Sequence, residues 1–67
     1  MNAEAAQLLT VDQARERLAV GRSVMYELMN DGSVRSILIG RSRRIPMDAI
    51  FEFIEAQMDE QAERGQQ

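Results

Sequence analysis

Residues 10–32 read TVDQARERLAVGRSVMYELMNDG and contain two helical patterns in close succession. The first part of this stretch opens on Thr10, with Gln13 three residues later, which fits a capping box in which each side chain bonds the backbone N–H of the other residue. The apolar side chains that follow recur at helical spacing and predict a helix over residues 11–19. They are Val11, Ala14 and Leu18.

A second helical pattern begins almost at once. Ala19 to Gly21 interrupt the first pattern, and apolar residues then recur at i, i+3 and i+4, which predicts a helix over residues 22–31. Gly32 is the natural left-handed residue after its end. Two short helices joined by so tight a turn are typical of a helix-turn-helix. The apolar residues of the second helix are Met25, Leu28 and Met29, the methionines as core fillers.

The remaining segments predict a basic hairpin and a third helix. Residues 35–45 have the composition of two strands around a turn at Gly40, with Ile37 and Ile39 on one face. Pro46 suits the first position of a helix over residues 46–58. Its apolar stripe comprises Ile50, Phe53, Ile54 and Met58, with Met58 as a third core-filling methionine.

These elements predict a mainly α, α+β winged helix-turn-helix domain over residues 8–58. Residues 1–7 are expected to be a flexible N-terminus, and residues 59–67 a frayed acidic and polar tail, because neither segment has an apolar face. Leu8 and Leu9 either pack onto the first helix or form a short strand. No repeat or linker divides the chain.

The composition argues against an enzyme. Among 67 residues there is no cysteine and no histidine, so disulfides, Cys/His zinc sites and imidazole bases are excluded. We expect no metal, no cofactor and no small-molecule ligand. The absence of a long apolar run and of a signal-peptide pattern predicts a cytoplasmic protein with no membrane partner. Such a chain is expected to work by binding.

The charge is unevenly distributed. The net charge is −3, yet residues 13–45 carry seven arginines against three acidic residues, whereas residues 46–67 carry six acidic residues against one arginine. All eight cations are arginine, which suits bidentate contacts to phosphate and guanine. A GC-rich genome, which favours arginine codons, is the alternative explanation. The asymmetry points to a basic binding surface followed by an acidic helix.

Residues 8–54 resemble the excisionase and MerR-like winged helix-turn-helix proteins of phages and mobile elements. The segments that carry the resemblance are Leu9-Thr10-Val11, Val20 with Arg22-Ser23, Tyr26-x-Leu28, Gly32 and Ile39-Gly40-Arg41-x-x-Arg44-Ile45-Pro46. Gly21 departs from the family, which prefers serine as the N-cap. Glu27 replaces a residue that is often basic or polar, and Arg43 one that is often aromatic.

The resemblance implies a sequence-specific double-stranded DNA-binding protein. Its second helix would enter the major groove, and the hairpin wing would reach an adjacent minor groove or the backbone. An excisionase binds repeated sites beside the attachment sequence, bends the DNA and directs a phage integrase toward excision. The implied setting is the nucleoid of a bacterial host, with cooperative self-association of copies on DNA.

Six residues are the candidate DNA contacts. Arg22 is placed in the first turn of a helix, where the helix dipole disfavours a cation unless an anion or a guanine is near. Ser23 and Tyr26 share its face, although the Tyr26 ring could equally pack on the edge of the core. Arginines beside a hairpin turn suit a narrow minor groove. Those of the wing are Arg41, Arg43 and Arg44.

Three functions remain open from the sequence. The first is an excisionase, and the second is a small prophage transcriptional regulator. The third is a protein-interaction module that uses the acidic C-terminal helix, with the basic patch incidental. In the first two functions the acidic helix is a solvent-exposed outer surface, because its negative charge prevents it from facing DNA.

Overall fold

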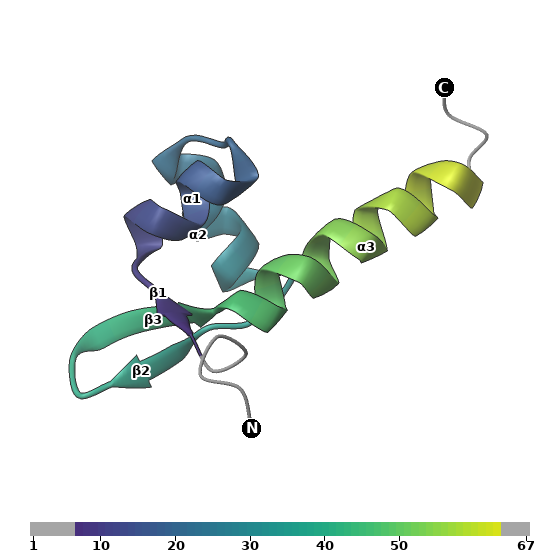
Figure 1. Ribbon diagram of the computed structural model, residues 1–67. Coiled ribbons are helices and arrows are strands. Elements are labelled where there is room, and N and C mark those ends of the chain that lie inside the picture. The colour runs from purple at the N-terminus through teal and green to yellow at the C-terminus, as the bar shows by residue number, and fades with distance from the viewer. Residues whose placement is uncertain (1–6, 64–67) are drawn as a thin grey trace.

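The computed structural model describes residues 7–63, which fold as three helices and one small antiparallel sheet (Figure 1). The order of elements is that of a winged helix-turn-helix, as the sequence predicts. Residues 1–6 and 64–67, parts of the two expected flexible ends, lie outside the described residues. The elements are β1 (Leu8–Leu9), α1 (Val11–Leu18), α2 (Arg22–Asn30), β2 (Ile37–Ile39), β3 (Ser42–Pro46) and α3 (Met47–Glu63).

Helix α1 is bounded by two local signals. The predicted capping box is present: the Gln13 backbone N–H donates to Thr10 Oγ1 over 3.1 Å, and the Thr10 N–H donates to Gln13 Oε1 over 3.0 Å. The helix ends at Leu18, one residue before the predicted end, because Ala19 adopts the left-handed conformation (φ 58°). Its N–H turns back to the carbonyls of Arg15 and Glu16, as in helix C-caps that glycine usually forms.

Helix α2 starts without a side-chain cap and ends two residues before a glycine. Gly21 is the N-cap and offers no side-chain acceptor to the first turn. At the other end the helix stops at Asn30, one residue before the predicted end. Gly32 takes a positive φ of 83°, as predicted, while Asp31 Oδ1 accepts from the Ser33 N–H over 2.8 Å. The chain is thereby turned toward the hairpin.

Strand β3 is the centre of the sheet, whose order is β1-β3-β2. Leu8 and Leu9 form a strand, the second of the two alternatives that the sequence leaves open, and they pair with Pro46 and Ile45. The Met47 N–H also donates to the Gln7 carbonyl over 3.0 Å, so residue 7, placed by the sequence in the flexible N-terminus, is tied to the sheet. The sheet thus joins the start of the domain to the start of α3.

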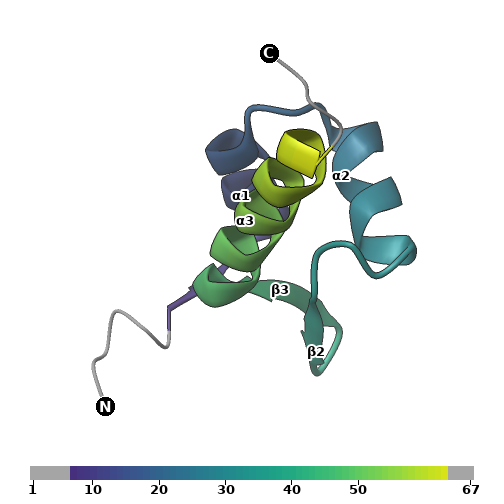
Figure 2. The same ribbon diagram turned by 90° about the vertical axis from the view of Figure 1, so that its right-hand side faces the viewer.

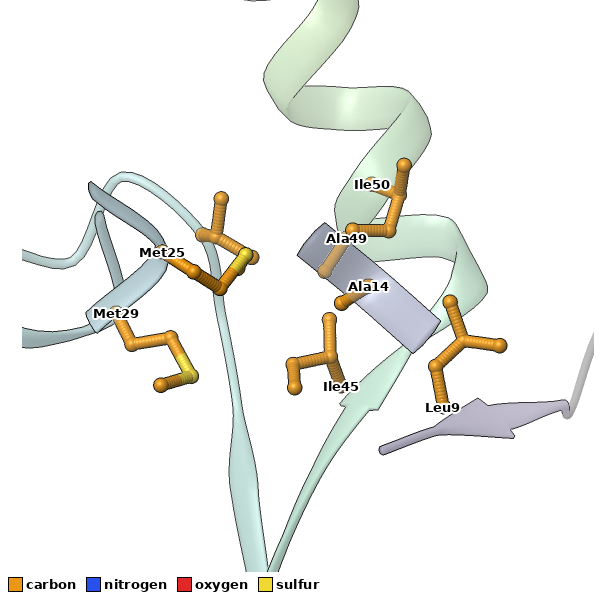
Figure 3. Close-up of a cluster of buried hydrophobic side chains, with 8 residues drawn as sticks. Leu9, Ala14, Met25, Met29, Ile45, Ala49 and Ile50 are labelled. Carbon is orange, nitrogen blue, oxygen red and sulfur yellow. The ribbon is translucent and has the colours of Figure 1, made fainter. Parts of the chain in front are cut away.

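The core lies between the sheet and the helices (Figure 3). Ile45 and Met25 are fully buried in it, and Met29 is almost so, which confirms two of the three methionines predicted as core fillers. Burial of a side chain of this size stabilises the fold by about 1.5–3 kcal/mol. The buried residues are Leu9, Ala14, Met25, Met29, Val34, Ile45, Ala49 and Ile50.

Helix α3 differs most from its predicted form. It begins at Met47, since Pro46 is the last residue of β3, and it continues to Glu63 rather than stopping at residue 58. Its C-terminal half extends away from the rest of the molecule (Figure 1). Met58, predicted to be buried, is 65 % exposed, and Ile54 is also exposed, because no other element of residues 7–63 covers this part of the helix. Strong helix formers such as Glu, Gln, Ala and Met sustain its last turns.

Candidate nucleic-acid interface

The solvent-facing side of α2 holds three of the predicted contact residues. Met25 and Met29 turn inward, which leaves Arg22, Ser23 and Tyr26 on the exposed side. Tyr26 is 42 % exposed and is not among the residues packed against the core. Of the two roles that the sequence leaves open for this ring, the structure therefore favours the exposed one. Guanidinium and hydroxyl groups on one helix face suit hydrogen bonds to phosphates and base edges.

Arg22 is held by a carboxylate that the sequence analysis did not connect with it. Its Nη1 donates to Oδ1 of Asp12, in the first turn of α1, and Arg15 Nε donates to the same oxygen over 3.2 Å. The hydrogen bond from Arg15, together with the attraction of Arg22, lowers the pKa of Asp12. Asp12 therefore carries its negative charge at neutral pH, directly beside the leading candidate for base contact.

The hairpin of β2 and β3 carries Arg41 at its tip. Ile39 pairs with Ser42, so Gly40 and Arg41 form a two-residue turn, and Gly40 has the positive φ (62°) that such turns require. Arg41 is exposed. A tight turn holds this guanidinium away from the core, in the position expected of a wing contact.

Arg43 and Arg44 lie on opposite faces of the hairpin. Side chains alternate along a strand, and Ile45 points into the core, so Arg43 shares the face of the helices, where its Nη1 donates to Ser36 Oγ over 3.0 Å. Arg44 pairs with Ile37 on the outer face, is half-buried, and donates to the Arg43 carbonyl over 2.9 Å. The structure thus separates two arginines that the sequence groups together.

The outer face of the sheet carries exposed apolar side chains. Residues directly opposite in an antiparallel pair share a face, which places Leu8, Ile37 and Ile39 on the same side. All three are exposed. The expectation that Ile37 and Ile39 share a face is confirmed by this register, but the face they share points to solvent.

The hairpin and α2 lie on the same side of α3 in the view along that helix (Figure 2). The hairpin tip and the C-terminal end of α3 point in opposite directions (Figure 1), so the carboxylates near that end are remote from Arg41. A helix that presents Arg22 beside a hairpin that presents Arg41 can contact neighbouring parts of one duplex. Within residues 7–63, no helix has the length and apolar character needed to cross a membrane, and no group of potential metal ligands occurs.

Comparison with known proteins agrees with this geometry. The family model described as "Helix-turn-helix domain" matches residues 8–58. An excisionase of Streptomyces ambofaciens is 44 % identical over 54 residues, which cover 81 % of this chain and 87 % of that protein. A probable excisionase of Saccharopolyspora erythraea is 46 % identical over 46 residues, 69 % of this chain and 47 % of that protein, so the match spans about half of its length. No solved structure matches significantly.

The fold and the family match define a helix-turn-helix protein, a class that acts by binding DNA and catalyses no reaction. With a relative of nearly its own length at this identity, the chain belongs to the excisionase-like helix-turn-helix family. The protein is therefore not an enzyme.

Proposed function

We propose that this protein is an excisionase of a phage or another mobile element. It binds repeated sites beside the attachment sequence, bends the duplex and directs an integrase toward excision. The observation that carries the proposal is the 44 % identity to an excisionase over 87 % of its length. A protein in this role works at the nucleoid of its bacterial host.

In this proposal α2 reads base edges in the major groove, with Arg22 as the specific contact and Ser23 and Tyr26 as positioning contacts. The hairpin follows the backbone or the adjacent minor groove, with Arg41 at its tip and Arg43 and Arg44 as further contacts. The exposure of Arg22 and Arg41 supports both roles. A bidentate contact of arginine to guanine discriminates against other bases by about 1–3 kcal/mol.

The test is selection of binding sites from a random duplex pool, followed by titration at several salt concentrations. An excisionase is expected to recover direct repeats about one helical turn apart, and a bend should appear when the site is moved along a fragment. The slope of log affinity against log salt should rise by about 0.9 for each phosphate contacted. A palindrome that overlaps a promoter would instead favour a prophage regulator, and a flat salt profile would favour a protein-interaction module.

The exposed side of α3 supports a protein partner in addition to DNA. Phe51 is 58 % exposed, and Ile54 and Met58 are exposed on the same helix, among carboxylates. Isolated apolar residues are ordinary on a surface, but three on one helix form a contact stripe. We propose that this stripe binds the integrase, while copies of the protein associate on adjacent sites.

Replacing Phe51 by Ser together with Met58 by Gln tests the role of this stripe. The double variant should keep its affinity for a single site, because neither side chain is among the proposed DNA contacts, but should lose stimulation of integrase-driven excision. Full stimulation by the variant would contradict the integrase contact. Cooperative binding to two adjacent sites, measured for the same variant, separates self-association from the integrase contact.

A further inference from the structure

Asp12, in the first turn of α1, connects the two helices of the helix-turn-helix through an arginine on each of them. Its Oδ1 accepts from Arg15 Nε on its own helix and from Arg22 Nη1 on α2. The two partners differ in exposure: the side chain of Arg22 is 57 % exposed, whereas that of Arg15 is 32 % exposed. Arg22 is therefore the more exposed of the two arginines.

This arrangement leaves Arg22 both oriented and able to bind. A guanidinium has five N–H donors in a fixed planar fork. The hydrogen bond to Asp12 is made by Nη1, so the other donors of the fork remain for a second acceptor. A side chain already held in one orientation loses less rotamer entropy when it pairs with a base edge.

The same carboxylate opposes binding to phosphate. An arginine without a neighbouring anion is attracted to any backbone phosphate, and this attraction is independent of sequence. A carboxylate in contact with the guanidinium offsets that charge and repels an approaching phosphate. The two effects act in the same direction, because both favour a guanine partner over a phosphate partner.

We propose that Asp12 is a specificity-determining residue, which positions Arg22 for a base edge and suppresses its binding to phosphate. The inference rests on the proposed DNA contact of Arg22 and adds to it the residue that controls that contact. In this role Asp12 touches no DNA and acts only through Arg22.

The experiment compares Asp12→Asn with wild type on the duplex recovered by selection and on a scrambled duplex. The Asn variant should bind the scrambled duplex about threefold more tightly, with a salt slope steeper by up to about 0.9, since Arg22 gains a phosphate. The ratio of specific to scrambled affinity should fall about tenfold. Asp12→Glu, which keeps the carboxylate, should retain most of that ratio.

Glu16→Gln is the matched control, because it removes the same charge from the same helix at an exposed position without a contact to Arg22. A control variant with the same tenfold fall would overturn the proposal in favour of a general charge effect. An unchanged ratio in Asp12→Asn would also overturn it. Thermal melts of each variant show that the protein compared is folded.

A double-mutant cycle with Arg22→Ala completes the test. If Asp12 acts through Arg22, then Asp12→Asn should leave the affinity ratio unchanged once Arg22 is absent. An equal effect in both backgrounds would overturn the proposal. Failure of wild type to bind any duplex would instead reject the proposed function, and the two failures are therefore distinguishable.

Discussion

The guanidinium of Arg35 binds the carboxylate of Glu52 through two hydrogen bonds, from Nε to Oε1 over 3.0 Å and from Nη2 to Oε2 over 3.1 Å. Arg35 lies between α2 and β2, and Glu52 lies on α3, so the pair connects the base of the hairpin to the third helix. Hydrogen bonding to Glu52 raises the pKa of Arg35. Both side chains are more than half exposed.

Replacing Glu52 by Gln should change the melting temperature very little. Exposed ion pairs contribute little to stability even in good geometry, because water and salt screen them. The hydrogen-exchange protection of the segment between α2 and β2 should fall instead, since that segment loses its tie to α3. A large drop in melting temperature, measured by circular dichroism at moderate salt, would show that the pair supports the whole fold.

Two identical substitutions on the sheet should differ in their effect on stability. Ile45→Val removes a methylene from a fully buried side chain, and such changes cost about 0.5–1.5 kcal/mol. Ile39→Val, on the exposed face, should cost close to nothing. Urea unfolding of both variants measures the difference, and equal losses would contradict the assignment of the two faces.

The two helix caps should respond in opposite directions. Thr10→Ala removes the side chain that accepts from the Gln13 N–H and should destabilise the protein by about 1 kcal/mol. Gly21→Ser gives α2 the cap that it lacks and should stabilise it by a few tenths of a kcal/mol. Space is available, because a Cβ at Gly21 has no neighbour within 4 Å. Denaturant titrations check both signs.

Arg43 and Arg44 should make unequal contributions to DNA affinity. Arg43→Ala is expected to weaken binding to specific and scrambled duplexes alike, because this side chain lies on the hairpin face nearer the helices. Arg44→Ala should weaken DNA binding less and lower stability more, since Arg44 is half-buried whereas Arg43 is exposed. Parallel gel-shift titrations and melts separate the two effects. The reverse ranking would place the duplex on the outer face.

The effect of Asp12 on stability should depend on pH. Because the folded state lowers the pKa of Asp12 below its ordinary value of 3.8, its contribution is present above that pH and is lost as the pH falls through the lowered value. Wild type should therefore be more stable than Asp12→Asn at neutral pH, and the difference should shrink on acidification. Denaturant unfolding at several pH values measures it. A constant difference would show that the charge of Asp12 is not involved.

Local signals explain why the helices could be predicted from the sequence. One such signal is the capping box of Thr10 and Gln13 at the start of α1, and another is Gly32 after the end of α2. Each depends only on residues next to it in the sequence, and both are present in the structure. The predictions that were wrong concern which other elements pack against a helix. Periodicity identified the stripe that includes Met58 but not whether another element covers it, and none within residues 7–63 does so.

In the candidate site, too, the features set by local sequence could be predicted and those set by tertiary packing could not. Helical spacing was enough to place Arg22, Ser23 and Tyr26 together on α2, and turn chemistry was enough to place Arg41 at a hairpin tip. The hydrogen bond between Arg22 and Asp12 depends on the angle between two helices, which no local pattern encodes. A carboxylate in the first turn of α1 had an adequate explanation in the helix dipole, so its second role left no separate trace in the sequence.

The opposed directions of the hairpin and of α3 give the molecule a polarity. If copies bind direct repeats, every hairpin would point toward one end of the DNA and every α3 toward the other. A row of such copies would therefore have two different ends, unlike a symmetrical assembly. Such an oriented assembly could distinguish the two sides of a recombination site, as recombination in one direction requires.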